Sequence, residues 1–400
     1  MTEDTTSRRR VLGTCGAALA MAGTAGCSGL PPLGTAVRYG EVDVPDPEPP
    51  GYREWLPAPT AHPTTDEDYD VMVYTPPPSD AVDWTRASVP RAILVSFTDY
   101  LGVHIDDVEL AFTGEATAAL LGEFEPSAVE ETAARTSYEP DGTVAGYDVY
   151  RRPDTEKIAA VSRNRLLFSS GPAPREAVEA MIGAHSGEVP RYHEEAPVFA
   201  DLSAGSGRRR WNWLVPGGVE REDDDTIESD TVGWATGFEH DEDSVYFVQT
   251  WLFPPDYDLT ESGVKAALNQ RDRAIDATAV DIEVADRTAT IASQLRQDRF
   301  LAEHANEGFL VPYATWNGEY DEAAEQLTIR HEAGDAVSTG RLSIRGDDDL
   351  TLRTDAGPRI GPGDELTVST AGVAAGATIR MIYESADGKR SSALFNYDLP

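Results

Sequence analysis

Val232-Gly-Trp-Ala-Thr-Gly-Phe238 and Val245-Tyr-Phe-Val-Gln-Thr-Trp-Leu-Phe253 flank the acidic run Glu239-His-Asp-Glu-Asp243. Aromatic and β-branched residues are frequent in both flanking segments, and these residue types are enriched in strands. The charged run between them is typical of a turn exposed to water. We therefore predict a β-hairpin here, and the segments on either side extend the pattern.

A helix and a second hairpin follow this first hairpin. Thr260 is placed to cap a helix, with Leu259 and Val264 at the two positions of a hydrophobic staple. A last hairpin pairs residues 279–284 with 288–292 around a short Asp-Arg turn. The order in this part of the chain is therefore strand, strand, helix, strand, strand.

The preceding residues, 69–200, show a similar order. Strands are expected at 69–74, 108–112, 118–124 and 146–151, with a hairpin at 158–169 and a short apolar run at 92–97. Helices are expected at 126–135, which has proline in its first turn, and at 174–185, which Gly187 ends. The repeated order predicts an α+β fold with a duplicated strand-strand-helix-strand-strand body, each half being a sheet with helices on one face.

We place the first α+β unit at residues 61–200 and the second at 201–305. Their arrangement bears on function. A cleft between two similar lobes would favour a ligand-binding protein, whereas one continuous sheet without a cleft would favour a scaffold.

After about Asn306 the pattern changes to strands alone. Short strands are expected at 327–331, 341–345, 350–353, 365–369, 378–384 and 392–397. Turn-forming residues such as Gly361-Pro-Gly-Asp364 and Ala386-Asp-Gly388 separate them. This spacing predicts a small all-β sandwich of immunoglobulin-like type over residues 306–400.

The N-terminus carries a targeting pattern. Three adjacent arginines, Arg8 and Arg9 among them, precede an uncharged segment that ends in Ala25-Gly-Cys27. This order is typical of an export signal, and the uncharged segment is shorter than the roughly 20 residues of a membrane-spanning helix. We therefore assign residues 1–26 to a signal peptide and the proline-rich residues 27–60 to a spacer and an arm that packs on the body.

Ser7-Arg-Arg-Arg-Val-Leu12 resembles the twin-arginine export pattern, and Thr24-Ala-Gly-Cys27 resembles a lipobox. The resemblance implies that the chain crosses the membrane folded, is cut before Cys27 and carries a lipid on the Cys27 sulfur. Two residues depart from these patterns: Gly13 stands where lysine is frequent, and Thr24 stands where a lipobox usually has leucine. The implied location is the extracellular face of the cytoplasmic membrane.

The charge of the chain points to an unusual solvent. Asp and Glu number 70 against 33 Lys and Arg, for a net charge of −37. In molar salt the Debye length falls to about 3 Å, which screens this self-repulsion. The acid excess with few lysines resembles proteins of salt-loving archaea, and it disfavours binding to nucleic acid. Cys15 and Cys27 are the only cysteines, so the lipidated mature chain is expected to fold without a disulfide.

Two further segments resemble haloarchaeal surface proteins. The run Trp55-Leu-Pro57 is similar to the start of one group of them. The run Leu327-Thr-Ile-Arg-His-Glu-Ala-Gly-Asp-Ala-Val337, with Leu342-Ser-Ile344 and a late Gly-x-Gly-Asp segment, resembles the β-domain of type IV pilin-like proteins. Pilins polymerise through a long apolar N-terminal helix that this sequence lacks. The resemblance therefore implies the domain and not the filament.

One motif suggests catalysis. Ser262-Gly-Val-Lys265 matches the Ser-x-x-Lys of serine penicillin-recognising enzymes, and it lies near a helix start, where Lys265 could activate the hydroxyl of Ser262. The companion Lys-Thr-Gly motif is missing, as is a Gly-x-Ser-x-Gly elbow. An extracellular hydrolase that uses Ser262 and Lys265 is therefore kept as an alternative to a non-enzymatic protein.

An acidic run at residues 220–230 suggests a cation site. Asp223, Asp225 and Glu228 could offer carboxylate oxygens to calcium, although the run lacks the glycine and glutamate spacing of an EF-hand. A solvated acidic loop is the competing interpretation. No other cofactor is expected, because the seven histidines are scattered without zinc-binding spacing.

Arg208-Arg-Arg-Trp-Asn-Trp213 is the one basic and aromatic cluster of the mature chain. Arg210, Trp211 and Trp213 could stack a sugar or nucleotide ring. In the competing interpretation, the arginines pair with nearby carboxylates and the two tryptophans, two residues apart on a strand, face one core.

The sequence as a whole favours a non-enzymatic binding or structural module of the cell envelope, held at the membrane by a lipid on Cys27. Its expected partners are envelope proteins or a small soluble ligand. The alternatives are the hydrolase described above and a solute-binding lipoprotein.

Overall fold

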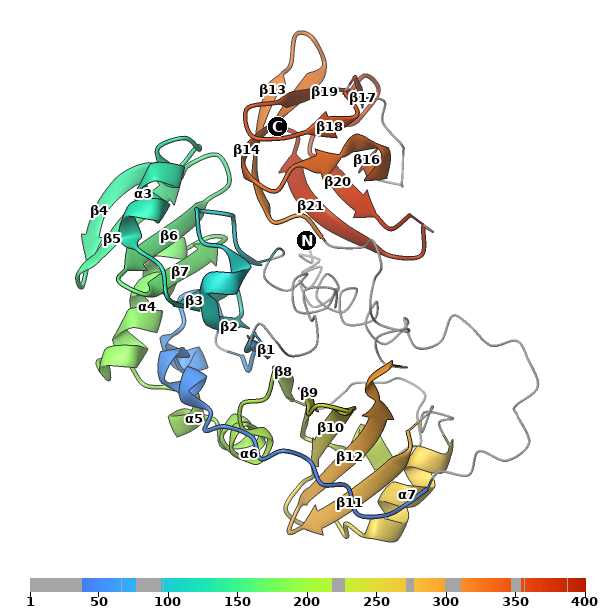
Figure 1. Ribbon diagram of the computed structural model, residues 1–400. Coiled ribbons are helices and arrows are strands. Elements are labelled where there is room, and N and C mark those ends of the chain that lie inside the picture. The colour runs from blue at the N-terminus through green and yellow to red at the C-terminus, as the bar shows by residue number, and fades with distance from the viewer. Residues whose placement is uncertain are drawn as a thin grey trace, which may run out of the picture. The chain divides into compact units, whose positions relative to one another are not determined.

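The computed structural model describes residues 38–65, 67–76, 95, 97–217, 227–270, 277–298, 311–346, 354–355, 357–386 and 388–400 (Figure 1). Arg38–Pro400 form one compact unit. Its regular structure is mostly β, in one large antiparallel sheet and several small sheets. The predicted strand at 350–353 and most of the apolar run at 92–97 lie outside the described residues.

The large sheet has twelve strands among the described residues, and every neighbouring pair is antiparallel (Figure 1). In sheet order they are β11 (Ala279–Ala285), β12 (Thr288–Arg296), β10 (Ser244–Leu252), β9 (Gly233–His240), β8 (Trp211–Pro216), β1 (Val71–Tyr74), β2 (Val108–Gly114), β3 (Thr117–Gly122), β7 (Arg165–Ser170), β6 (Lys157–Ser162), β5 (Tyr147–Arg152) and β4 (Glu139–Val144). The three predicted hairpins are present as β9–β10, β6–β7 and β11–β12.

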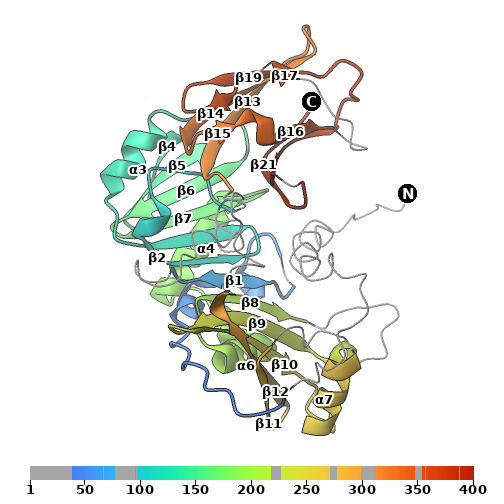
Figure 2. The same ribbon diagram turned by 45° about the vertical axis from the view of Figure 1, so that its right-hand side comes forward.

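Strands β1 and β8 lie at the middle of this sheet. They pair antiparallel, with Val71 opposite Leu214 and Tyr74 opposite Trp211. On their outer sides β1 pairs with β2 and β8 pairs with β9. Strands from the two predicted α+β units therefore belong to one continuous sheet (Figure 2).

Hydrophobic clusters lie on both faces of the sheet in the half that holds β2, β3, β6 and β7. Along β2, Ala111 lies in the hydrophobic cluster that holds α3 (Pro126–Ala133), and Phe112 lies in the cluster that holds α4 (Pro174–Ser186). Because neighbouring residues of a strand point to opposite faces, α3 and α4 cover opposite faces. The expectation of helices on one face is therefore wrong for this half. The unbroken runs of buried residues in β6 and β7 reflect the two covered faces.

The helices begin and end at residues suited to those positions. Proline is the first residue of α3, α4 and α6 (Pro197–Ser206). It is suited to this position because an N–H at the start of a helix has no acceptor within the helix. Gly187 ends α4 in the left-handed conformation, with φ of 79°. In α7 (Glu261–Gln270) the predicted cap is confirmed, because the Thr260 hydroxyl accepts the Gly263 N–H at 3.2 Å.

The remaining helical segments are short. They are α5 (Tyr192–Glu195), η1 (Gly51–Trp55), η2 (Pro59–Ala61), η4 (Ile105–Asp107), η5 (Ile227–Asp230) and η6 (Thr339–Arg341).

The N-terminal arm, residues 38–61, packs along the large sheet. Tyr39 forms a bridge with Val280 of β11, and Glu48 forms one with Arg208 just before β8. Trp55 of η1 is buried in the same hydrophobic cluster as the buried residues of α4 and α6. The proline-rich segment is thus part of the folded body from Tyr39 onward.

The described part of residues 311–400 forms three small sheets. The first contains β13 (Ala314–Asp321), β14 (Gln326–Gly334), β19 (Glu365–Ser369) and β17 (Thr354–Asp355), the second β16 (Leu342–Arg345), β20 (Thr378–Glu384) and β21 (Ser391–Asp398), and the third β15 (Val337–Ser338) and β18 (Arg359–Ile360). Trp316 and Ile329 of the first sheet share one hydrophobic cluster with Met381 and Phe395 of the second. These two sheets therefore enclose a core of their own.

Candidate functional site

The three arginines 208–210 lie in the short segment between α6 and β8. Gly207 precedes them with φ of 58°, and a Cβ at this position would meet the side chain of Pro47 at 2.6 Å. The backbones of Arg208 and Glu48 exchange two hydrogen bonds, of 2.7 and 2.9 Å. The arginine segment is therefore held closely against the N-terminal arm.

Two of the arginines have carboxylate partners. Arg208 forms an ion pair with Glu48, whose side chain is 55% exposed. The Nε of Arg210 lies 3.5 Å from Oε1 of Glu239, and its Nη1 donates to the carbonyl oxygen of Pro76 at 3.3 Å. In the sequence analysis, pairing with carboxylates is the alternative to ring stacking, and Arg208 and Arg210 pair in this way.

Arg209 is different. It is 7% exposed, its Nη1 donates to the carbonyl oxygen of Pro45 at 3.1 Å, and its Nε has no hydrogen-bond partner. Among the described residues, no carboxylate forms an ion pair with it. Burial lowers the pKa of Arg209, while the charges of Glu239 and Asp46 act in the opposite direction. This guanidinium is a buried cation whose hydrogen-bond partner is one backbone carbonyl.

A pocket of about 160 Å³ lies beside these arginines. Its walls come from Pro45, Asp46 and Glu48 of the arm, from the arginine segment, from Thr75 after β1 and from the last two residues of β9. The Nε of Arg208 and the hydroxyl of Thr75 are buried without partners. Burial lowers the pKa of Arg208, and the nearby charge of Arg210 adds to this effect. The pocket wall therefore carries several unpaired donors.

The two tryptophans do not line this pocket. Trp211 is 4% exposed, and its ring lies 5.4 Å from that of Phe238. Trp213 is partly buried, donates from Nε1 to Asp70 at 3.3 Å and meets the edge of Trp234 at 4.9 Å. Because both indoles already contact an aromatic ring of the sheet, this geometry does not support the stacking of a sugar or nucleotide ring on them.

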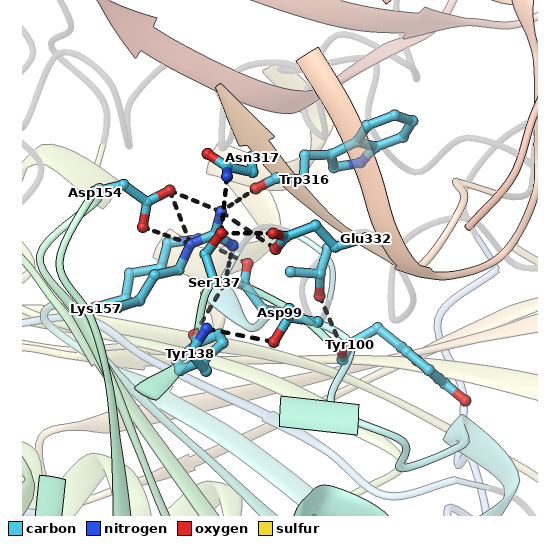
Figure 3. Close-up of polar contacts among 12 residues, drawn as sticks. Asp99, Tyr100, Ser137, Tyr138, Asp154, Lys157, Trp316, Asn317 and Glu332 are labelled. Carbon is cyan, nitrogen blue, oxygen red and sulfur yellow. Dashed lines mark hydrogen bonds and ion pairs between the residues drawn. The ribbon is translucent and has the colours of Figure 1, made fainter. Parts of the chain in front are cut away.

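A second cluster of charges, which the sequence did not reveal, centres on Arg152 at the end of β5. Figure 3 labels the surrounding residues, among them Asp99, Asp154 and Glu332. The Arg152 side chain is 1% exposed. Its Nε and Nη2 donate to the two oxygens of Asp154 at 3.0 and 2.9 Å, and its Nη1 donates to Asp99 at 3.2 Å. Lys157 donates to the other oxygen of Asp99 at 2.7 Å.

The same guanidinium reaches the C-terminal sheets. Its Nη2 donates to the carbonyl oxygen of Trp316 in β13 and lies 3.6 Å from Oε2 of Glu332 in β14. The Ser137 hydroxyl donates to Glu332 at 2.5 Å and accepts from the Asn317 amide at 2.8 Å. We call Arg152, Asp99, Asp154, Lys157 and Glu332 the Arg152 cluster.

Within the Arg152 cluster, Asp99 and Arg152 favour each other's charged form. Burial alone would raise the pKa of Asp99, but the charges of Lys157 and Arg152 outweigh it and the net shift is downward. Burial also opposes the charge on Arg152, yet Asp99 and Asp154 raise its pKa. Because each charge depends on the others, this cluster fixes how β5 meets β13 and β14.

The Ser262 and Lys265 pair lies in α7, near its start, as the motif requires. The Ser262 side chain is exposed, with its hydroxyl 3.3 Å from that of Thr260. Lys265 donates to Glu261 and lies over the ring of Tyr39 at 4.9 Å. Among the described residues, the contacts of the Lys265 amine are thus with Glu261 and Tyr39, and the Ser262 hydroxyl lies beside Thr260, so the structure does not pair Ser262 with Lys265.

Several predicted residues fall outside the description. Arg8, Arg9, Cys27, Asp223 and Asp225 lie outside the described residues, and Glu228 is described only as part of η5. Within the described ranges, no three His, Cys, Asp or Glu side chains are grouped to hold a metal ion. In the same ranges, no helix is both long and apolar enough to span a membrane.

Comparisons with models of protein families and with curated proteins found no match. Among solved structures, crystal form III of TP0453 is similar with a TM-score of 0.38 and 8% identity, covering 66% of this chain and 97% of that chain. Crystal form IV of TP0453 gives a TM-score of 0.39 and 8% identity, covering 65% and 96%. Likeness at this level identifies neither a family nor an activity.

Proposed function

We propose that this protein is a lipid-anchored surface module of a salt-loving archaeon that works as a non-enzymatic envelope scaffold. The pairing of β1 with β8 carries the proposal, because it puts both units into one continuous sheet. Binding proteins that close on a ligand use two lobes joined by a hinge. Strands hydrogen-bonded along the whole sheet resist such a hinge and suit a surface of fixed shape.

The strand orders support a duplicated body. Counted outward from the middle, the first unit runs β1, β2, β3, β7, β6 and the second runs β8, β9, β10, β12, β11. In each unit a helix, α3 or α7, follows the third strand, and the last strand returns to pair beside that third strand. The first unit adds β4 and β5 at its outer edge.

The C-terminal sheets support an immunoglobulin-like sandwich that resembles the β-domain of pilin-like proteins. The two motif segments behind that resemblance are hydrogen-bonded to each other: the His331 N–H donates to Asp364 at 2.9 Å, and the Gly363 N–H donates to His331 at 2.7 Å. The Nε2 of His331, which is fully buried, lies 2.8 Å from the carbonyl oxygen of Asp335. These motif residues thus have a structural role within the sandwich.

The Arg152 cluster also supports a scaffold. It joins β5 of the large sheet to β13 and β14 through a guanidinium with little exposure. Moving the two parts relative to each other would leave buried charges without partners, which is costly. The cluster therefore favours a fixed arrangement of body and sandwich over a mobile one.

The location rests on the sequence. Arg8 and Arg9 would direct export of the folded chain, and the lipid on Cys27 would hold it outside the cytoplasmic membrane. We expect substitution of Arg8 and Arg9 by lysine to retain the protein inside the cell, as measured by surface labelling. Normal surface labelling of that variant would refute the export signal.

A pull-down from native high-salt membranes tests the scaffold itself. We expect the intact lipoprotein to recover envelope proteins. If it recovers none, and a soluble metabolite raises its melting temperature instead, the protein is a solute-binding lipoprotein. The arginine pocket is the observation that favours this second candidate.

A further inference from the structure

The chain buries two arginines in different ways. Arg152, with 1% of its side chain exposed, has the carboxylates of Asp99, Asp154 and Glu332 around it. Arg209, with 7% exposed, has the carbonyl oxygen of Pro45. A buried cation is costly unless a counter-charge and hydrogen bonds compensate it. The charges of Glu239 and Asp46 act on Arg209 from a distance, but among the described residues it has no ion pair of the kind that the same fold supplies to Arg152.

Three residues that line the 160 Å³ pocket carry a buried polar group without a partner. These groups are the Nε–H donors of Arg208 and Arg209 and the hydroxyl of Thr75, which can donate or accept. Unpaired buried polar groups in a native fold commonly mark a site for a water or an ion. The complementary ligand is one that offers several acceptor oxygens.

The acids of the pocket do not fill this role. Glu48 lies at the surface and pairs with the outer nitrogen of Arg208. Glu239 accepts the His240 N–H at 3.1 Å and lies near Arg210. Asp46 is exposed on the arm. The inner donors around Arg209 therefore remain available to an incoming anion.

We propose that this pocket binds a small oxyanion of the phosphate, sulfate or carboxylate class. The planar guanidinium donates two parallel hydrogen bonds to such groups, which favours them over a single-atom halide. The volume is also well above the roughly 10–15 Å³ that one water needs, so a polyatomic anion fits. The ligand would touch both the N-terminal arm and the end of β8, and so fasten the arm to the sheet.

Equilibrium dialysis of the full chain against labelled inorganic phosphate and labelled sulfate, in a constant high-chloride buffer, tests the site. Detergent is added if the chain carries a lipid. We expect saturable binding of one of the two anions, at one per chain, in competition with chloride. The Arg209→Gln variant should lose about tenfold or more in affinity, because a charged donor is removed. Acetate should displace the bound label if carboxylates share the site.

The matched control is Arg296→Gln, which removes an exposed arginine paired with Asp298 and should leave binding unchanged. The Arg209→Gln variant is expected to melt no lower than the native chain without phosphate, because it loses a buried charge that has no ion pair. If it does not fold, Thr75→Val removes a pocket donor and serves in its place. Absence of saturable binding, or equal binding by the pocket variant, overturns the proposal, as does a site that only chloride occupies.

Discussion

At the scale of single residues, Arg152 shows how a few side chains connect the large sheet to the C-terminal sheets. Its guanidinium uses all three nitrogens, toward Asp154, Asp99 and the carbonyl oxygen of Trp316. Asp154 lies two residues from Arg152, but Asp99 and Trp316 come from distant parts of the chain, so no local pattern of residues marks the whole cluster. We expect the Arg152 cluster to select one arrangement of β5 against β13 and β14 more than to add net stability to the fold.

Removing the Arg152 charge should therefore be costly. We expect Arg152→Leu to lower the free energy of unfolding by about 3–5 kcal/mol, because it leaves Glu332 buried without its cation and Asp99 with Lys157 alone. Urea unfolding in high salt measures this change. The control is Arg330→Leu, which breaks an exposed ion pair with Glu365 and should cost less than about 1 kcal/mol. Equal losses in the two variants would contradict the account.

His62, the residue that follows the N-terminal arm, makes stability depend on pH. Burial lowers the pKa of His62 from 6.5 to about 4, and its Nε2 has no partner among the described residues. Below about pH 6.5 the imidazole of His62 binds a proton in the unfolded chain but not in the folded chain. The free energy of unfolding therefore falls as the pH drops toward 4. We expect His62→Gln to lose less stability over that range than the native chain, by urea unfolding. The exposed control His104→Gln should follow the native curve.

At the scale of elements, the sequence identifies strands and hairpins well where local pattern suffices. The β9–β10 hairpin and the capped α7 lie where their residues predict them. The two-sided cover of β6 and β7 was missed, although Ile158-Ala-Ala-Val161 and Leu166-Leu-Phe168 are apolar without alternation. Such runs indicate a strand buried on both faces, and this signal was available in the sequence.

The end of β14 offers a second test at this scale. Gly334 has φ of 98°, and a Cβ on it would lie 2.2 Å from the carbonyl oxygen of Tyr313. Gly363 has a similar φ of 90° with nothing within 4 Å. We expect Gly363→Ala to cost about 1–2 kcal/mol from the left-handed backbone alone. Gly334→Ala should lower the stability measured by thermal unfolding clearly more. Equal losses of stability in the two variants would show that the backbone near Tyr313 shifts to make room for the new Cβ.

At the scale of the whole molecule, the β1–β8 pairing makes the two units depend on each other. Val73 is 1% exposed in β1, at the centre of the sheet. We expect Val73→Asp, which buries an unpaired charge, to reduce amide protection from hydrogen exchange in both β3 and β10. Loss of protection in β3 alone would mean that the units fold separately and would weaken the scaffold proposal.

The pocket could be predicted from the sequence only in part. The run of arginines at 208–210 stands out in an acidic chain, but the sequence named Arg210, Trp211 and Trp213 as the candidate ligand contacts and favoured a structural role for the run. The distinction between Arg209 and its neighbours comes from Pro45 and Glu48, which lie far away in the sequence. Long-range packing of the arm thus determines which arginine has no ion pair.

We propose that a lipid on Cys27 displays this folded body outside the cell. Fractionation of cells that produce the native chain or the Cys27→Ser variant, with melting curves of both proteins, tests this location. We predict that the native chain stays with the membrane and reacts with an external label. The variant should leave the membrane fraction and melt at the same temperature. A variant that remains bound to the membrane as firmly as the native chain would contradict the account.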